Sequence, residues 1–119
     1  MRACVIIPAR YKSSRFPGKP LVKLLGKEMI IWVAELSSKA VGKNNVFVAT
    51  DNLKIESKVR ESGFKSIMTS SDLLTGTDRV AAASLDLDYD IYVNVQGDEP
   101  LIDPNDILRS IKLKKDFPS

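Results

Sequence analysis

Four strand-length apolar runs recur along the chain, and a segment with helical spacing or a helix cap follows each of them. The runs cover residues 5–7, 46–50, 64–68 and 90–95. The first run, Val5-Ile6-Ile7, is continuous and β-branched, as is typical of a strand buried on both faces of a parallel sheet. Alternating strands and helices of this kind predict an α/β fold with a parallel sheet.

The longest helical pattern covers residues 28–40. Its apolar residues recur at three- and four-residue spacing, which predicts an amphipathic helix with Trp32 packed in the core. The residues that set this spacing are Met29, Trp32, Val33, Leu36 and Ala40, and Ile30, Ile31 and Ala34 widen the apolar stripe.

The next two helices are expected to begin at polar side chains that can cap a helix. Asp51 or Asn52 precedes a pattern that ends at Ser62-Gly63. Thr75 or Thr77 can cap a helix over residues 80–85. In both places the sequence leaves two candidates for the cap.

The last helix is expected after the fourth strand. Asp103 and Pro104 match an N-cap followed by a proline at the first helical position, and Asp106 adds an acidic residue to the first turn. This helix is predicted to run to about residue 115.

The handedness of crossover connections predicts the strand order from the alternation of strands and helices. Right-handed crossovers in a doubly wound sheet give the strand order 3-2-1-4, with helices on both faces. The first and fourth strands are then neighbours at the topological switch point, where ligands bind beyond the carboxyl ends of the strands. We expect residues 1–119 to form a single Rossmann-like nucleotide-binding domain.

The loop after the first strand is cationic. Pro17, Gly18 and Pro20 restrict its path, because proline fixes φ and glycine reaches conformations closed to other residues. Taken alone, such a loop is as readily a solvated surface as a binding site. Its position at the switch point favours an anion site, since arginine suits bidentate contacts and lysine acts as a point charge. The four cations are Arg10, Lys12, Arg15 and Lys19.

Acidic residues follow the fourth strand, in Gln96-Gly97-Asp98-Glu99. As an isolated tetrapeptide this is more often a plain turn. Beside the cationic loop, however, it completes what a nucleoside triphosphate with a divalent cation requires, because Asp98 can hold Mg²⁺ while the cations contact phosphate oxygens. We therefore predict Asp98 as a Mg²⁺ ligand.

Two common nucleotide-binding motifs are missing. The loop is not a Walker motif, because Pro20 stands where a serine or threonine would bind Mg²⁺ and the first glycine is lacking. There is no G-x-G-x-x-G fingerprint either. The sequence thus supports neither a P-loop NTPase nor a dinucleotide-dependent oxidoreductase, and leaves a nucleotidyl-transferring domain open.

Composition narrows the chemistry further. The chain has 119 residues, a net charge of +3, no histidine and a single cysteine. Catalysis by imidazole and most catalytic zinc sites are excluded, and Cys4 is expected to be a small core residue. Interspersed charges argue against nucleic acid as a partner. With neither a signal peptide nor a membrane-length apolar stretch, and with no thiol pair, we expect a cytoplasmic protein without a membrane contact.

Four motifs in register resemble one family. They are IPARYKSSRFPGKPL at residues 7–21, VATD at 48–51, TGTDR at 75–79 and NVQGDEP at 94–100. Together they are similar to the 3-deoxy-manno-octulosonate (Kdo) cytidylyltransferases, the CMP-Kdo synthetases, over nearly the whole chain. The resemblance implies transfer of CMP from CTP to the anomeric hydroxyl of Kdo, with release of pyrophosphate, for lipopolysaccharide biosynthesis.

The resemblance also assigns roles to residues. It implies Arg10, Lys19 and Asp98 as catalytic groups, Gln96 as a substrate contact, and Mg²⁺ as the cofactor on Asp98. For Arg79 alone, an exposed cation at the start of a helix is an equally good interpretation. The nucleotide-binding set that it implies is Pro8, Arg10, Arg15, Lys19, Thr77 and Arg79.

Members of this family are considerably longer than 119 residues. The resemblance implies that the remaining part carries most of the sugar pocket, a second acidic metal ligand and the interface of a homodimer. We expect this chain alone to bind a nucleotide weakly and to turn over little. Two alternatives stay open: a non-catalytic nucleotide-binding half, or transfer to another acid sugar such as amino-Kdo or a nonulosonate.

Overall fold

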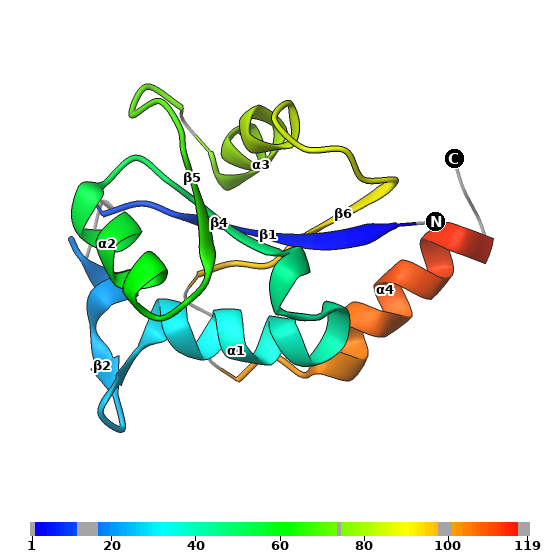
Figure 1. Ribbon diagram of the computed structural model, residues 1–119, viewed down its shortest axis with the longest axis horizontal. Coiled ribbons are helices and arrows are strands. Elements are labelled where there is room, and N and C mark those ends of the chain that lie inside the picture. The colour runs from blue at the N-terminus through cyan, green and yellow to red at the C-terminus, as the bar shows by residue number, and fades with distance from the viewer. Residues whose placement is uncertain (1, 12–16, 74, 98–100, 117–119) are drawn as a thin grey trace.

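The computed structural model describes residues 2–11, 17–73, 75–97 and 101–116. Within them a four-stranded parallel sheet has the spatial order β5-β4-β1-β6 (Figure 1). The predicted order 3-2-1-4 is therefore confirmed. The strands are β1 (Ala3–Ala9), β4 (Val46–Thr50), β5 (Lys65–Met68) and β6 (Ile91–Asn94).

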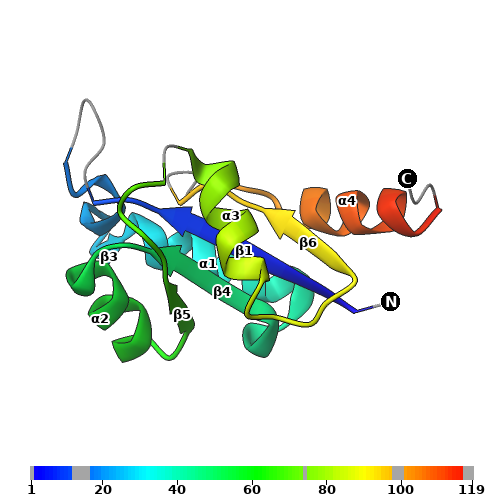
Figure 2. The same ribbon diagram turned by 90° about the horizontal axis from the view of Figure 1, so that it is seen from above.

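Helices cover both faces of this sheet, as expected (Figure 2). Three of them pack on one face: α1 (Met29–Val41), α2 (Leu53–Glu61) and α4 (Pro104–Asp116). The helix α3 (Gly76–Ser84) packs on the other. The predicted positions of all four helices are confirmed, and α3 begins four residues earlier than expected.

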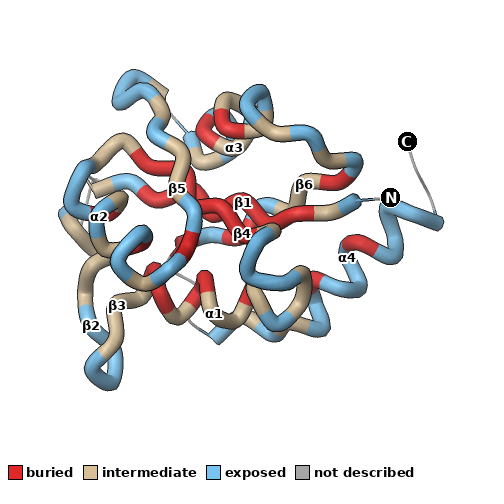
Figure 3. The backbone as a smooth tube through the Cα atoms, in the orientation of Figure 1, coloured by how far each residue is buried: buried red, intermediate tan, exposed pale blue. Residues whose placement is uncertain are grey.

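Alternation along β1 builds both halves of the core. Val5 and Ile7 join the cluster under α1, α2 and α4, whereas Cys4 and Ile6 join the cluster under α3. All four side chains are fully buried, and Figure 3 shows the buried residues concentrated along β1 and β4. A strand buried on both faces is what the continuous apolar run predicts.

The structure decides between the alternative helix caps. The Asn52 side chain accepts hydrogen bonds from the backbone N–H groups of Lys54 at 2.9 Å and Ile55 at 3.2 Å. Thr75 Oγ1 accepts one from Asp78 N at 3.0 Å. Each cap satisfies backbone donors that the first turn of a helix leaves without partners.

Trp32 is not a core residue, contrary to the expectation. It is half-buried, and its indole Nε1 donates to the Leu24 carbonyl at 2.7 Å. Leu24 belongs to a small antiparallel hairpin of β2 (Lys23–Leu24) and β3 (Lys27–Glu28) that leads into α1. Within the predicted stripe, the half that is buried on the sheet is the one that contains Ile30, Ile31, Val33 and Ala34, together with Ser37. Met29, Trp32, Leu36 and Ala40 are only partly buried.

Two single-turn 3₁₀ helices complete the described elements, η1 (Lys19–Leu21) and η2 (Lys43–Asn45). Among the described residues, no helix has both the length and the apolar character needed to span a bilayer.

Candidate functional site

The carboxyl ends of β1 and β6 meet at one edge of the sheet. Gly97, just after β6, is buried against this junction. A Cβ added at Gly97 would lie 3.2 Å from the Pro8 carbonyl oxygen and 3.2 Å from Ile30 Cδ1. Any side chain here would push the two strand ends apart, so the glycine permits their close approach.

The start of α3 reaches the same junction from the other face. A Cβ added at Gly76 would lie 3.3 Å from Pro8 Cγ and 3.5 Å from both polar atoms of the Gln96 side-chain amide. Gln96 is exposed, and its Nε2 donates to Asn94 Oδ1 at 3.2 Å. The structure thus brings together three of the predicted segments, at Pro8, at Gln96 and at the beginning of α3.

Two of the predicted cations flank this junction. Arg10 is exposed and directly follows β1, while Lys19 is partly exposed at the start of η1. The ends of the intervening loop are joined, because Gly18 N donates to the Tyr11 carbonyl at 2.5 Å. Gly18 has a φ of 76°, a left-handed conformation that favours glycine.

Three predicted site residues, Lys12, Arg15 and Asp98, lie outside the described residues. The roles assigned to them remain predictions. Within the described part of the chain, no group of three or more histidine, cysteine, aspartate or glutamate side chains could hold a metal ion.

Arg79 is fully buried, which corrects the interpretation of an exposed cation at the helix start. Its Nη1 donates to Thr69 Oγ1 and, at 3.2 Å, to the Ser70 carbonyl. Its Nη2 lies 3.5 Å from Asp51 Oδ2. The guanidinium therefore connects α3 with the residues that directly follow β4 and β5.

Electrostatics link the two arginines. Burial lowers the pKa of Arg79, the Asp51 carboxylate raises it, and the charge of Arg10 lowers it. Because arginine stays protonated under ordinary conditions, Arg10 and Arg79 both carry a positive charge at this edge of the sheet, and Asp51 neutralises part of the charge of Arg79. The described charges favour an anionic ligand, as does the amino end of α3.

The two threonines of the third motif have separate surroundings. Thr75 caps α3, whereas Thr77 is exposed in its first turn. Thr77 thus remains accessible to a ligand. The sequence alone cannot separate them, because both match a cap pattern.

The partners of Arg79 were missed by sequence reasoning. Asp51 belongs to one of the four motifs and is a possible helix cap, whereas Thr69 lies outside all four motifs. A signal was present, since both residues directly follow predicted parallel strands, and the carboxyl ends of such strands share one edge.

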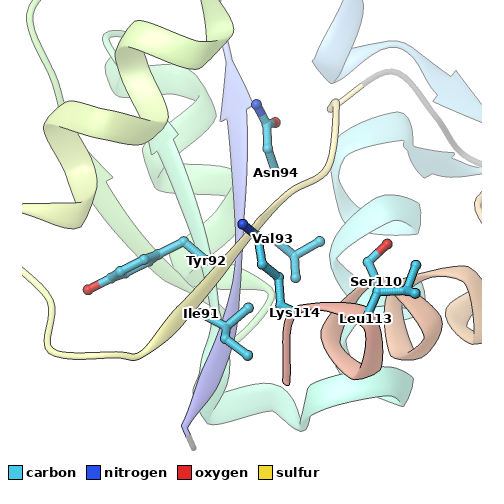
Figure 4. Close-up of a pocket in the computed structure, with 7 residues that line it drawn as sticks. All are labelled: Ile91, Tyr92, Val93, Asn94, Ser110, Leu113 and Lys114. Atoms are coloured by element: carbon cyan, nitrogen blue, oxygen red, sulfur yellow. The ribbon is translucent and has the colours of Figure 1, made fainter. Parts of the chain in front are cut away.

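A separate groove lies between β6 and α4. Val93 of β6 faces Ser110 and Leu113 of α4 across it (Figure 4). Its lining is mainly apolar and contains none of the residues predicted to bind a nucleotide or a sugar. The remaining lining residues are Ile91, Tyr92, Asn94 and Lys114.

Known proteins share this fold and much of this sequence. The chain is 49% identical over 121 residues to the 8-amino-3,8-dideoxy-manno-octulosonate cytidylyltransferase of Shewanella sp. (strain ANA-3). It is 44% identical over 118 residues to the 3-deoxy-manno-octulosonate cytidylyltransferase of Escherichia coli. Each match covers 99% of this chain and 49% or 48% of the relative, so the chain spans about half the length of these relatives.

A solved structure gives the same picture. CMP:2-keto-3-deoxy-manno-octonic acid synthetase, solved in complex with CTP, superposes with a TM-score of 0.95 at 44% identity. The match covers 100% of this chain and 49% of that one. A model of the family described as cytidylyltransferase matches residues 4–117. The chain therefore belongs to the cytidylyltransferase family.

Proposed function

We propose that this chain is the nucleotide-binding part of a cytidylyltransferase that transfers CMP from CTP to an acid sugar of the Kdo type, with release of pyrophosphate. The observation that carries the proposal is the meeting of Pro8, Gly76 and Gln96 beside Arg10 at the carboxyl edge of the sheet. Ligands of open parallel sheets bind at this edge. Membership in the family supplies the reaction class.

Arg10, Arg15 and Lys19 would hold the triphosphate. Phosphoryl-type transfer relies on positioning and on neutralisation of charge, so cations in this loop would stabilise the charge that develops on the pyrophosphate leaving group. Pro8 and Thr77 would contact the nucleoside, and Gln96 would contact the substrates at the strand end. A histidine is not needed for any of these roles.

A divalent cation, Mg²⁺, would be held by Asp98. Mg²⁺ in nucleotide sites is commonly bound through one or two carboxylates together with substrate phosphates. This donor set fits a part of the chain in which the described residues offer no cluster of ligands. When bound, the cation would neutralise phosphate charge and orient the triphosphate.

The acceptor sugar has two candidates. The Escherichia coli relative is named for 3-deoxy-manno-octulosonate, and the Shewanella relative for its 8-amino derivative. We also keep a homodimer of the full-length protein and a cytoplasmic location as proposals, the latter because the single cysteine has no thiol to pair with.

The experiment that tests this function measures pyrophosphate release from CTP, with Mg²⁺ and either Kdo or 8-amino-Kdo. The chain is compared with its Asp98→Asn variant and with Asp86→Asn as a matched control, because Asp86 is exposed in the loop at the opposite end of the sheet. UTP replaces CTP in a parallel series. Thermal unfolding is followed with and without each nucleotide.

We expect CTP with Mg²⁺ to raise the unfolding temperature of the chain and of Asp86→Asn, and to do so less for Asp98→Asn. Turnover by the chain alone is expected to be slight. Pyrophosphate release that is rapid and lost in Asp98→Asn would support the function and overturn the expectation that the other half of the relatives is needed. Neither release nor protection would contradict the proposed function.

A further inference from the structure

Arg79 stands out as a buried charge whose hydrogen-bonding capacity is not filled. Its side chain is fully buried, yet Nε and Nη2 make no hydrogen bond to the described residues. A buried donor without a partner lowers stability, so an arginine in this setting is not what core stability alone would select. A role in the adjacent site is the simpler explanation.

The contacts of Arg79 lie inside the protein, and not on the surface that a ligand would meet. With no exposed surface, its guanidinium is not available to a ligand in this conformation. Instead Nη1 holds the first two residues after β5, through the Thr69 hydroxyl and the Ser70 carbonyl. The Thr69 backbone N–H also donates to the Thr50 carbonyl at the end of β4, at 2.9 Å.

Asp51 supplies the counter-charge. It directly follows β4 and is mostly buried, with 16% of its side chain exposed, and its Oδ2 lies 3.5 Å from Nη2. A charge without any exposed surface requires such a partner. The ion pair therefore ties the end of β4 to the same guanidinium that holds the end of β5.

The third connection runs through α3 itself. Arg79 is one turn into this helix, whose first residue, Gly76, packs against Pro8 and Gln96. One side chain thus links the ends of β4 and β5 to the helix start that abuts the ends of β1 and β6. The cationic loop of Arg10 and Lys19 is a separate segment, closed by its own hydrogen bond between Gly18 and Tyr11.

We infer that Arg79 is a positioning residue: through Thr69, Ser70 and Asp51 it holds the residues that directly follow β5, and with them the start of α3, in the form that receives the nucleoside end of the nucleotide. This inference rests on the proposed function. It differs from the role implied by the family resemblance, in which Arg79 contacts the nucleotide directly. The phosphates would be held by the other loop, so their binding should depend less on Thr69 than the binding of the nucleoside end does.

The test measures separately how the nucleoside end and the phosphate end of the nucleotide bind. Dissociation constants of CTP and of inorganic tripolyphosphate are measured by calorimetry with Mg²⁺, for the unmodified chain and for Thr69→Val, Arg79→Met and the double variant. Thr69→Ser is the matched control, because it keeps the hydroxyl that accepts from Arg79. Thr69→Val keeps the size and replaces the hydroxyl with a methyl group, which cannot accept from Arg79, so it serves even where Arg79→Met fails to fold.

Thr69→Val is expected to lower the affinity for CTP about tenfold, which is the equivalent of one net hydrogen bond. Its affinity for tripolyphosphate should stay within about twofold, and Thr69→Ser should match the unmodified chain for both ligands. Where Arg79→Met folds, the double variant should bind CTP no more weakly than Arg79→Met, because the two changes break the same connection.

Three results would overturn the inference. Unchanged CTP affinity in Thr69→Val would remove the connection through Thr69, and additive losses in the double variant would favour direct contact by Arg79. Equal losses for CTP and tripolyphosphate would indicate a general structural role. If the unmodified chain binds neither ligand, the proposed function fails first, and that outcome is distinct from the other three.

Discussion

Arg10 and Arg79 lie at the same edge of the sheet, close enough for the charge of one to lower the pKa of the other, but in opposite environments. Arg10 is exposed directly after β1, whereas Arg79 has no exposed surface and sits between Thr69, Ser70 and Asp51. Both were predicted to bind the nucleotide. The difference indicates that one motif arginine can contact a ligand directly, whereas another can hold in place the residues that form the site.

The largest expected effect is on stability. Arg79→Met should lower the free energy of unfolding by about 3 kcal/mol, because it removes the partner of the mostly buried Asp51 and the donor to Thr69 and Ser70. Arg10→Met should change it by less than about 0.5 kcal/mol, as is usual for exposed positions. Urea denaturation of the two variants measures both, and equal losses would erase the distinction between the arginines.

The second prediction concerns phosphate binding. Arg10→Met should lower the affinities for CTP and for tripolyphosphate by the same factor, about 30-fold. The reason is that a charge-assisted hydrogen bond contributes about 2 kcal/mol to affinity. Calorimetry with Mg²⁺ checks this. A loss confined to CTP would mean that Arg10 contacts the nucleoside and not the phosphates.

A third prediction uses Cys4, a buried thiol in the part of the core under α3. Burial raises the pKa of its thiol from 9.0 to about 12, and Arg2 opposes the shift. Between these values the unfolded chain loses the proton while the folded chain keeps it. Stability should therefore fall as the pH rises, by up to about 1.4 kcal/mol per pH unit.

The control for this prediction is Cys4→Ala, which has no thiol to titrate. Both proteins share every other alkaline titration, so the difference between their unfolding free energies isolates Cys4. That difference should be constant below pH 9.0 and should shift against the unmodified chain above it. A constant difference up to pH 12 would contradict the assigned environment.

The smallest expected effect separates two threonines of one motif. Thr75→Ala should lower stability by about 1 kcal/mol, because it removes the acceptor for the backbone N–H of Asp78. Thr77→Ala should keep the free energy of unfolding within about 0.5 kcal/mol of that of the unmodified chain and should lower the affinity for CTP. Thermal unfolding and CTP titration of both variants are the measurements, and a stability loss in Thr77→Ala larger than in Thr75→Ala would reverse the assignment.

Local patterns predicted most of the fold. The apolar runs and helical spacings gave the elements, and handedness rules were enough for the strand order, because few arrangements of parallel strands obey them. Trp32 was misplaced because the orientation of a helix on a sheet is set by tertiary packing. Its indole instead donates to the carbonyl of Leu24 in the neighbouring hairpin.

The candidate site was predicted less completely. Pro8, Gln96 and Arg10 could be expected together, since they follow strands that neighbour one another at the switch point. The burial of Arg79 was not predicted, because its partners Asp51 and Thr69 come from segments 28 and 10 residues away along the chain, and only their shared position after parallel strands indicated them. Spacing within one motif carries no information about such contacts.

The most direct test of the central claim is an amide chemical-shift map of the ¹⁵N-labelled chain, titrated with CTP and Mg²⁺. A nucleotide site at the carboxyl edge predicts the largest shifts at Arg10, Gly18, Lys19, Gly76 and Gln96. Shifts centred instead on Val93 and Leu113 would place the ligand in the groove between β6 and α4 and would contradict the account.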